Sequence, residues 1–160
     1  MELLWAPWRV EYILGKKSDG CMFCKKIKEK RDKDNLILHR AERTLVMMNR
    51  YPYNNGHLLV CPYKHSRDLE GLDEEEIKDL LSSVSRSTTL LKKALKPDGF
   101  NIGMNLGRIA GAGIEDHLHF HIVPRWSGDT NFMPVLAEAR VIPEHLEKTY
   151  QKLFKLFVNF

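Results

Sequence analysis

Three histidines alternate with apolar residues in the segment 117–123, which reads His-Leu-His-Phe-His-Ile-Val. Successive side chains of a β-strand point to opposite faces, so the three imidazoles share one face, about 6.5–7 Å apart along the strand. Leu118, Phe120 and Ile122 fix the strand on a core, and a slip of one residue would bury all three imidazoles. Imidazoles this close depress each other's pKa. Because a neutral imidazole can act as nucleophile, acid or base, the row indicates catalysis rather than a solvent-facing polar strand.

Other catalytic signatures are missing from the sequence. There is no Gly-x-Ser-x-Gly elbow and no Gly-x-x-x-x-Gly-Lys-Ser/Thr phosphate loop. The serines at 82, 83 and 85 fall within a helical apolar period. A metal hydrolase in which His117, His119 and His121 share one catalytic ion is an alternative, although three alternating positions of one strand span too far for one ion.

A second group of reactive side chains begins with Cys21-x-x-Cys24. Two thiols at this spacing can be a redox pair, half of a metal site or a coincidence. The total of three cysteines is odd, which disfavours a disulfide framework. Cys61 lies in an apolar segment and reads as a small buried residue, whereas His65 follows directly after that segment.

The elements that must position these residues alternate between strands and turns. Residues 36–39, 44–49 and 57–62 are predicted strands, and residues 51–56 (Tyr-Pro-Tyr-Asn-Asn-Gly) are a turn because Pro presets φ and Asn-Gly tolerates φ > 0. A helix begins near Asp73, with Glu76 as its capping partner, and ends before Pro97 and Gly99.

The second half of the chain repeats this pattern. Residues 100–105 and 117–124 are predicted strands on either side of the loop 106–116, which holds three glycines. Apolar residues after Pro143 recur at a helical period and predict a terminal helix. Hairpin-like strand pairs around one main helix indicate an α+β fold with an antiparallel sheet of about five strands.

Length and charge set the class of protein. The 160 residues fit one domain, with residues 1–20 as an N-terminal arm that carries three aromatic residues and 127–160 as a C-terminal extension. No apolar run approaches the ~20 residues of a membrane span, and the N-terminus lacks a signal-peptide layout, so a cytoplasmic protein with no membrane partner is expected. The net charge of +4 favours anionic ligands. The basic stretch 25–33 also holds Glu29 and Asp32, which indicates a solvated helix face; a nucleic-acid module would leave the histidine row unexplained.

These motifs together resemble the histidine triad (HIT) family. The resemblance runs from about residue 21 to 126 and includes Asn49, the segment Gly-His-Leu-Leu-Val at 56–60 and Asn105 before the glycine loop. Two further segments, Leu-Trp-Ala-Pro-Trp-Arg at 4–9 and Trp-Ser-Gly-Asp-Thr-Asn-Phe-Met-Pro at 126–134, are similar to the branch that contains bacterial-type diadenosine polyphosphate phosphorylases.

The resemblance implies a role for each matching residue. His119 would be the nucleophile that forms a nucleotidyl-histidine, with its other ring nitrogen donating to the carbonyl of His117. His121 and His57 would hold the phosphate and leaving-group oxygens. The nucleotide would also be held by Asn105 at the phosphate, by Asn49 at the ribose hydroxyls and by the backbone N–H groups of Gly111, Ala112 and Gly113. An apolar wall for the base is expected from Leu36, Leu45 and Met47.

The resemblance also implies a metal and a partner. Zinc-containing bacterial members use two cysteines and two histidines, which here would be Cys21, Cys24, His65 and His117 in a closed, structural site. We expect a homodimer whose sheets join, a nucleotide substrate, no organic cofactor and no nucleic-acid partner.

The acceptor of the nucleotidyl group is less defined. Many hydrolases of the family carry Gln or Ser just before the triad strand, whereas residues 111–116 here read Gly-Ala-Gly-Ile-Glu-Asp. The missing side-chain donor favours phosphate as acceptor and hence a dinucleoside polyphosphate phosphorylase. A hydrolase or phosphoramidase that uses water, or a slow nucleotide-binding regulatory module, remains open, as do the physiological substrate and the preferred base.

Overall fold

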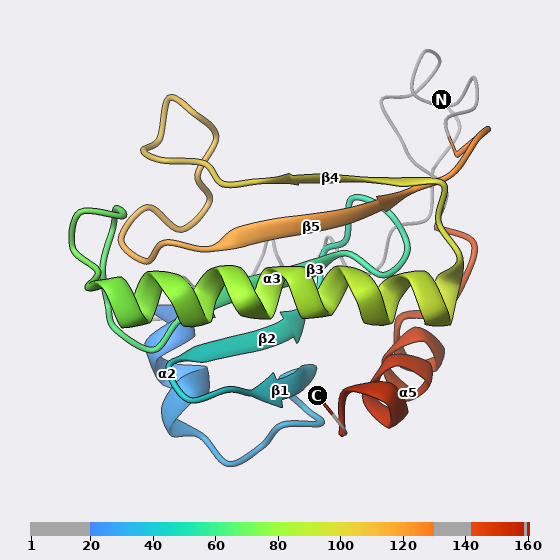
Figure 1. Ribbon diagram of the computed structural model, residues 1–160, viewed down its shortest axis with the longest axis horizontal. Coiled ribbons are helices and arrows are strands. Elements are labelled where there is room, and N and C mark those ends of the chain that lie inside the picture. The colour runs from blue at the N-terminus through green and yellow to red at the C-terminus, as the bar shows by residue number, and fades with distance from the viewer. Residues whose placement is uncertain (1–19, 130–141, 159) are drawn as a thin grey trace, which may run out of the picture.

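A computed structural model describes residues 20–129, 142–158 and 160. In this part of the chain five strands form one sheet in the order β1-β2-β3-β5-β4, with every neighbouring pair antiparallel (Figure 1). The strands are β1 (Ile37–Arg40), β2 (Thr44–Met48), β3 (Leu58–Pro62), β4 (Gly99–Gly103) and β5 (Phe120–Arg125). The helices are α2 (Met22–Lys28), α3 (Glu74–Leu95) and α5 (Leu146–Phe157). The predicted α+β class with a five-stranded antiparallel sheet is confirmed.

Helix α3 covers one face of the sheet and forms the larger core with it (Figure 1). Its start is fixed by a capping box, in which Asp73 accepts from the Glu76 N–H at 2.8 Å and Glu76 accepts from the Asp73 N–H at 2.9 Å. Helix α5 packs on α3 and on β1, and His145 caps its start by accepting from the Glu147 N–H. No helix in the described ranges is both long and apolar enough to cross a membrane.

The opposite face of the sheet carries the histidine row and a smaller core. Phe23 of α2 packs there against Leu45 and Met47, which are 0% and 1% exposed. The expected base wall is therefore wrong: Leu45 and Met47 are sealed beneath α2, and Leu36 belongs to the core on the α3 face.

Strand β5 begins later than the predicted strand 117–124. Its pairing with β3 ends at Val60–Phe120, and continuing this register would place Leu118 opposite Pro62, which has no N–H to donate. The Leu118 N–H instead donates to the Ser66 carbonyl at 2.6 Å. Alternation nevertheless persists beyond the ladder, because Leu118 remains in the α3-side core while His117 and His119 are buried on the other side.

Two predicted segments fall largely outside the described residues. The N-terminal arm, with the motif at 4–9, lies entirely outside them, and of the motif at 126–134 only the first four residues are described.

The turn before β3 requires glycine at position 56. Gly56 has φ +72°, and a Cβ placed on it would clash with Leu95 Cδ1. We expect Gly56→Ala to lower the free energy of unfolding by about 2 kcal/mol, because an L-residue is strained at this φ and Leu95 must move. Gly99→Ala is the matched control, since nothing lies within 4 Å of its Cβ position and its φ is not positive. Urea titration of both variants measures the difference, and equal stabilities would contradict the prediction.

Candidate active site

His57 is held at the end of the turn by backbone contacts on two sides. Its carbonyl accepts from the Asn49 N–H at 2.9 Å, and its own N–H donates to the Asn54 carbonyl at 3.2 Å. The imidazole is 0% exposed. Burial, followed by the neighbouring His121 and His119, lowers the pKa of His57 to about 3. His57 is therefore neutral at physiological pH.

Backbone geometry fixes which nitrogen of His57 carries the proton. The Tyr53 N–H can only donate, and it lies 3.0 Å from His57 Nδ1; the Asn49 amide nitrogen is 3.3 Å from the same atom. Nδ1 must therefore be the bare acceptor, and Nε2 carries the proton. His57 Nε2 is 3.0 Å from His121 Nδ1, so it donates to His121.

The hydrogen bond from His57 in turn determines the tautomer of His121. His121 Nδ1 is an acceptor, which leaves the proton of the neutral ring on Nε2. Burial, with a smaller contribution from His119, lowers the pKa of His121 to about 4, so the ring is neutral near pH 7. His121 therefore presents an N–H donor from Nε2.

His119 is the opposite tautomer, with its proton on Nδ1 rather than on Nε2. Its Nδ1 lies 2.8 Å from the His117 carbonyl, which can only accept, so Nδ1 carries the proton and Nε2 has a free lone pair. Burial lowers the pKa of His119, which keeps this lone pair available near pH 7. The His119 and His121 rings are 4.9 Å apart between centroids. The site therefore places a bare ring nitrogen of His119 beside an N–H donor of His121.

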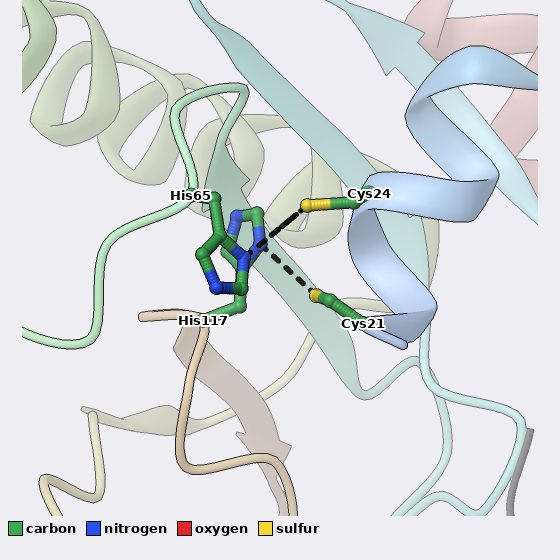
Figure 2. Close-up of side chains that lie close together, drawn as sticks. All are labelled: Cys21, Cys24, His65 and His117. Atoms are coloured by element: carbon green, nitrogen blue, oxygen red, sulfur yellow. Dashed lines mark hydrogen bonds between the residues drawn. The ribbon is translucent and has the colours of Figure 1, made fainter. Parts of the chain in front are cut away.

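His117 faces away from this pair toward α2. Its Nε2 lies 2.8 Å from the Pro62 carbonyl and so carries the proton, which leaves Nδ1 bare. Nδ1 points at the two cysteines, 3.2 Å from Cys21 Sγ and 3.6 Å from Cys24 Sγ. His65 Nδ1 lies 3.3 Å from Cys24 Sγ. Figure 2 shows the four side chains converging from α2, from the loop after β3 and from the segment before β5.

The dimensions of this Cys/His cluster suit zinc. The four ligand atoms lie within 4.8 Å of one another. A tetrahedral Zn²⁺ with bonds of about 2.3 Å to sulfur and about 2.0 Å to nitrogen separates neighbouring ligand atoms by roughly 3.5 Å, close to the separations found here. His117 also has its second nitrogen bonded to a carbonyl, the arrangement that orients metal-binding histidines. The predicted residues Cys21, Cys24, His65 and His117 therefore form a cluster that could hold a metal ion.

The side chains of the three triad histidines contact three different partners. His117 points to the cysteines, His119 to the His117 carbonyl and His121 to His57. This disfavours the alternative in which they share one catalytic ion.

The remaining predicted nucleotide contacts lie at the edges of this row. The Asn49 side chain bridges His57 and the Tyr51 N–H, to which its oxygen is an acceptor at 3.0 Å. Asn105 donates to the Gly111 carbonyl at 3.3 Å and so braces the glycine loop. Within the loop the N–H groups of Gly111 and Ala112 donate to the carbonyls of Arg108 and Gly107. A phosphate would have to compete with these contacts.

Comparison with known proteins assigns the family. The HIT domain model matches residues 30–128, and the chain belongs to the HIT family.

Its relatives extend the likeness beyond this domain. An AP-4-A phosphorylase of Mycobacterium tuberculosis is 34% identical over 96% of this chain and 83% of its own length. An adenosine 5′-monophosphoramidase of Schizosaccharomyces pombe is 35% identical over 66% of this chain and 74% of its own length. A Zn-bound histidine triad family protein from Mycobacterium smegmatis superposes with a TM-score of 0.70 at 27% identity, covering 88% of this chain and 94% of that one.

Sequence reasoning missed two residues that brace the site. Asn54 and Asp129 are 2.8 Å apart through Asn54 Nδ2 and Asp129 Oδ2, although 75 positions separate them in the chain. The turn and the motif at 126–134 were each recognised, but no local pattern connects them.

Proposed function

We propose that this chain cleaves dinucleoside polyphosphates by nucleotidyl transfer through His119, with inorganic phosphate as the acceptor. The observation that carries this proposal is that two neighbouring histidine rings are opposite tautomers. His119 offers a bare Nε2, and His121 offers an Nε2–H donor. A substrate with an electrophilic phosphorus and a departing oxygen needs both groups.

The chemistry proceeds in two displacements. His119 Nε2 attacks the α-phosphorus, the bond to the bridging oxygen breaks, and the remaining nucleotide leaves as a phosphate anion whose departing oxygen accepts a hydrogen bond from His121 Nε2–H. The nucleotidyl group is then bound to His119, while its Nδ1–H keeps the bond to the His117 carbonyl. A phosphate oxygen next attacks the same phosphorus, the P–N bond breaks, and a nucleoside diphosphate leaves.

A relative that matches nearly the whole chain supports the choice of reaction. This relative is named AP-4-A phosphorylase, and the match covers 96% of this chain. The loop 111–116 offers no Gln or Ser side chain before the triad segment, which is consistent with an acceptor bulkier than water.

A phosphoramidase is the second candidate. The relative named adenosine 5′-monophosphoramidase matches 66% of this chain at 35% identity. The same pair of rings would serve a P–N bond, because His119 Nε2 could attack the phosphorus and His121 Nε2–H could donate a hydrogen bond to a phosphate oxygen while the amine, protonated on the substrate, leaves.

Nucleotide contacts, metal and assembly complete the proposal. Asn49, Asn105 and the backbone of Gly111, Ala112 and Gly113 would hold the nucleotide, beside His57, His119 and His121. The Cys/His cluster would hold a structural Zn²⁺ that joins α2 to the segment before β5. A cytoplasmic location belongs to the same proposal. A homodimer with joined sheets is supported by β4, which pairs only with β5 among the described strands, and by Ile102 on this strand, which is 47% exposed.

Product analysis with diadenosine tetraphosphate tests the reaction. The purified protein is incubated with and without inorganic phosphate, and the nucleotides are separated. ADP plus ATP only with phosphate is expected. AMP plus ATP without phosphate would identify a hydrolase, whereas turnover of adenosine 5′-phosphoramidate alone would favour the second candidate. No nucleotide product from either substrate would contradict both.

Acidification should destabilise the fold through the buried histidines. The pKa of His57 falls from about 6.5 in an unfolded chain to about 3 here. The unfolded state therefore binds more protons below pH 6.5. Stability is full above that pH and declines as the pH falls toward 3.

The size of this effect can be isolated by comparison with a variant. Between pH 7 and pH 5 the wild type should lose about 2 kcal/mol more unfolding free energy than His57→Gln, which lacks the titrating group. Urea titrations at the two pH values measure it. Equal losses would show that His57 is not held neutral.

A further inference from the structure

Asn54 is a buried amide that joins the turn before β3 to the far end of β5. Asn54 is 6% exposed. The amide nitrogen donates to the Pro124 carbonyl at 3.1 Å and to Asp129 Oδ2 at 2.8 Å. Both hydrogens of the amide are therefore used.

Asp129 is held in place by the end of β5. Its carboxylate accepts from Arg125 Nε at 2.6 Å and from Arg125 Nη2 at 2.9 Å, and from the Trp126 N–H at 3.1 Å. This two-pronged ion pair orients the carboxylate. The Asp129 side chain is 9% exposed, so solvent screens its contact with Asn54 little.

The same turn residues surround His57. The Asn54 carbonyl accepts from the His57 N–H, and the preceding Tyr53 N–H donates to His57 Nδ1. The position of Asn54 therefore sets both the backbone of His57 and the donor that keeps its Nδ1 bare.

We propose that Asn54 and Asp129 form a latch that holds His57 in its Nε2–H tautomer and thereby makes His121 a hydrogen-bond donor at Nε2. Asn54 and Asp129 are positioning residues, since they act through His57. When the latch is open, the Tyr53 N–H leaves Nδ1, and His57 can carry its proton there instead. His57 Nε2 then accepts rather than donates, and His121 can turn its own proton inward to Nδ1. The consequence for turnover rests on the proposed function, whereas the tautomer itself does not.

Imidazole ¹⁵N spectroscopy tests the latch directly. In protein with ¹⁵N-labelled histidine, long-range ¹⁵N–¹H correlation distinguishes the two tautomers of His57, assigned by comparison with His57→Gln. Asn54→Ala and Asp129→Ala should each produce a population with Nδ1 protonated, which the wild type lacks. Asn54→Ala retains the Asp129–Arg125 ion pair. Each alanine variant opens the same contact, so either one tests the proposal if the other does not fold.

Two further variants separate positioning from general damage. Asp129→Asn keeps an oxygen that can accept from Asn54, and it should restore the wild-type tautomer. Asp98→Ala removes a neighbouring carboxylate that accepts from the Ser127 N–H at 2.6 Å without touching the turn, and it should leave the tautomer unchanged.

Kinetics supplies the second readout. With the nucleotide substrate that is turned over, the alanine variants should lower kcat about tenfold or more, since a fixed hydrogen-bond donor at developing charge contributes ~10²–10³-fold, and KM should change less than about twofold. An unchanged His57 tautomer in a folded alanine variant would overturn the latch. A wild type without turnover would instead count against the proposed function, and the tautomer measurement would still decide on the latch.

Discussion

Replacing His119 by alanine should abolish the nucleotidyl-enzyme and lower kcat by about 10⁴-fold or more. Removing the nucleophile of a covalent mechanism leaves only binding and electrostatic catalysis, and losses of this order follow in such enzymes. In this site no neighbouring ring can take over. His121 Nδ1 is engaged by His57 and its Nε2 carries the proton, and His117 Nδ1 points to the cysteines.

The enzyme is mixed with labelled dinucleoside polyphosphate and the reaction is quenched. The label bound to the protein, and its loss in acid, are then measured. His39→Gln is the matched control. His39 packs its ring against Phe160, with centroids 4.1 Å apart, and none of its described contacts reaches the triad. This variant should retain labelling and turnover within about twofold. A His119→Ala protein that is folded and still labelled would remove His119 as the nucleophile.

Loss of the Cys/His cluster should have the largest effect on stability. We expect purified protein to hold about one zinc per chain, and Cys24→Ser to lose the metal and to lower Tm by about 10 °C or more. Binding energy of a structural zinc is folding energy because the unfolded chain has no preformed site, and several kcal/mol correspond to such a shift in a chain of this size. Cys24 contacts both histidines of the cluster.

Metal analysis by mass spectrometry and thermal unfolding with and without a chelator check this expectation. Cys61→Ala is the control, since Cys61 is a 0% exposed thiol in the core beneath the cluster. It should retain the zinc while costing only the stability of a small buried side chain. If the wild type holds no zinc and the chelator leaves Tm unchanged, the cluster is not a metal site.

The periodicity of the sequence determined much of this protein. The alternation at 117–123 requires that the three histidines share a face, whichever strands flank them, because it follows from the two-residue period of extended chain. The capping pair Asp73–Glu76 and the helical apolar period determined α3 in the same way, since both are local. The Cys-x-x-Cys spacing showed two thiols close together, and the resemblance to the HIT family supplied their two histidine partners.

The tertiary structure alone decided how these residues act. Which nitrogen of each imidazole carries the proton depends on the Tyr53 N–H and on the carbonyls of Pro62 and His117, and only packing places such groups against a ring. Packing also buried Leu45 and Met47 beneath Phe23, where the sequence had suggested an open wall. The Asn54–Asp129 contact joins positions 75 apart. Local sequence patterns carry no signal for such contacts, because they arise only when the sheet brings distant backbone segments within hydrogen-bonding distance.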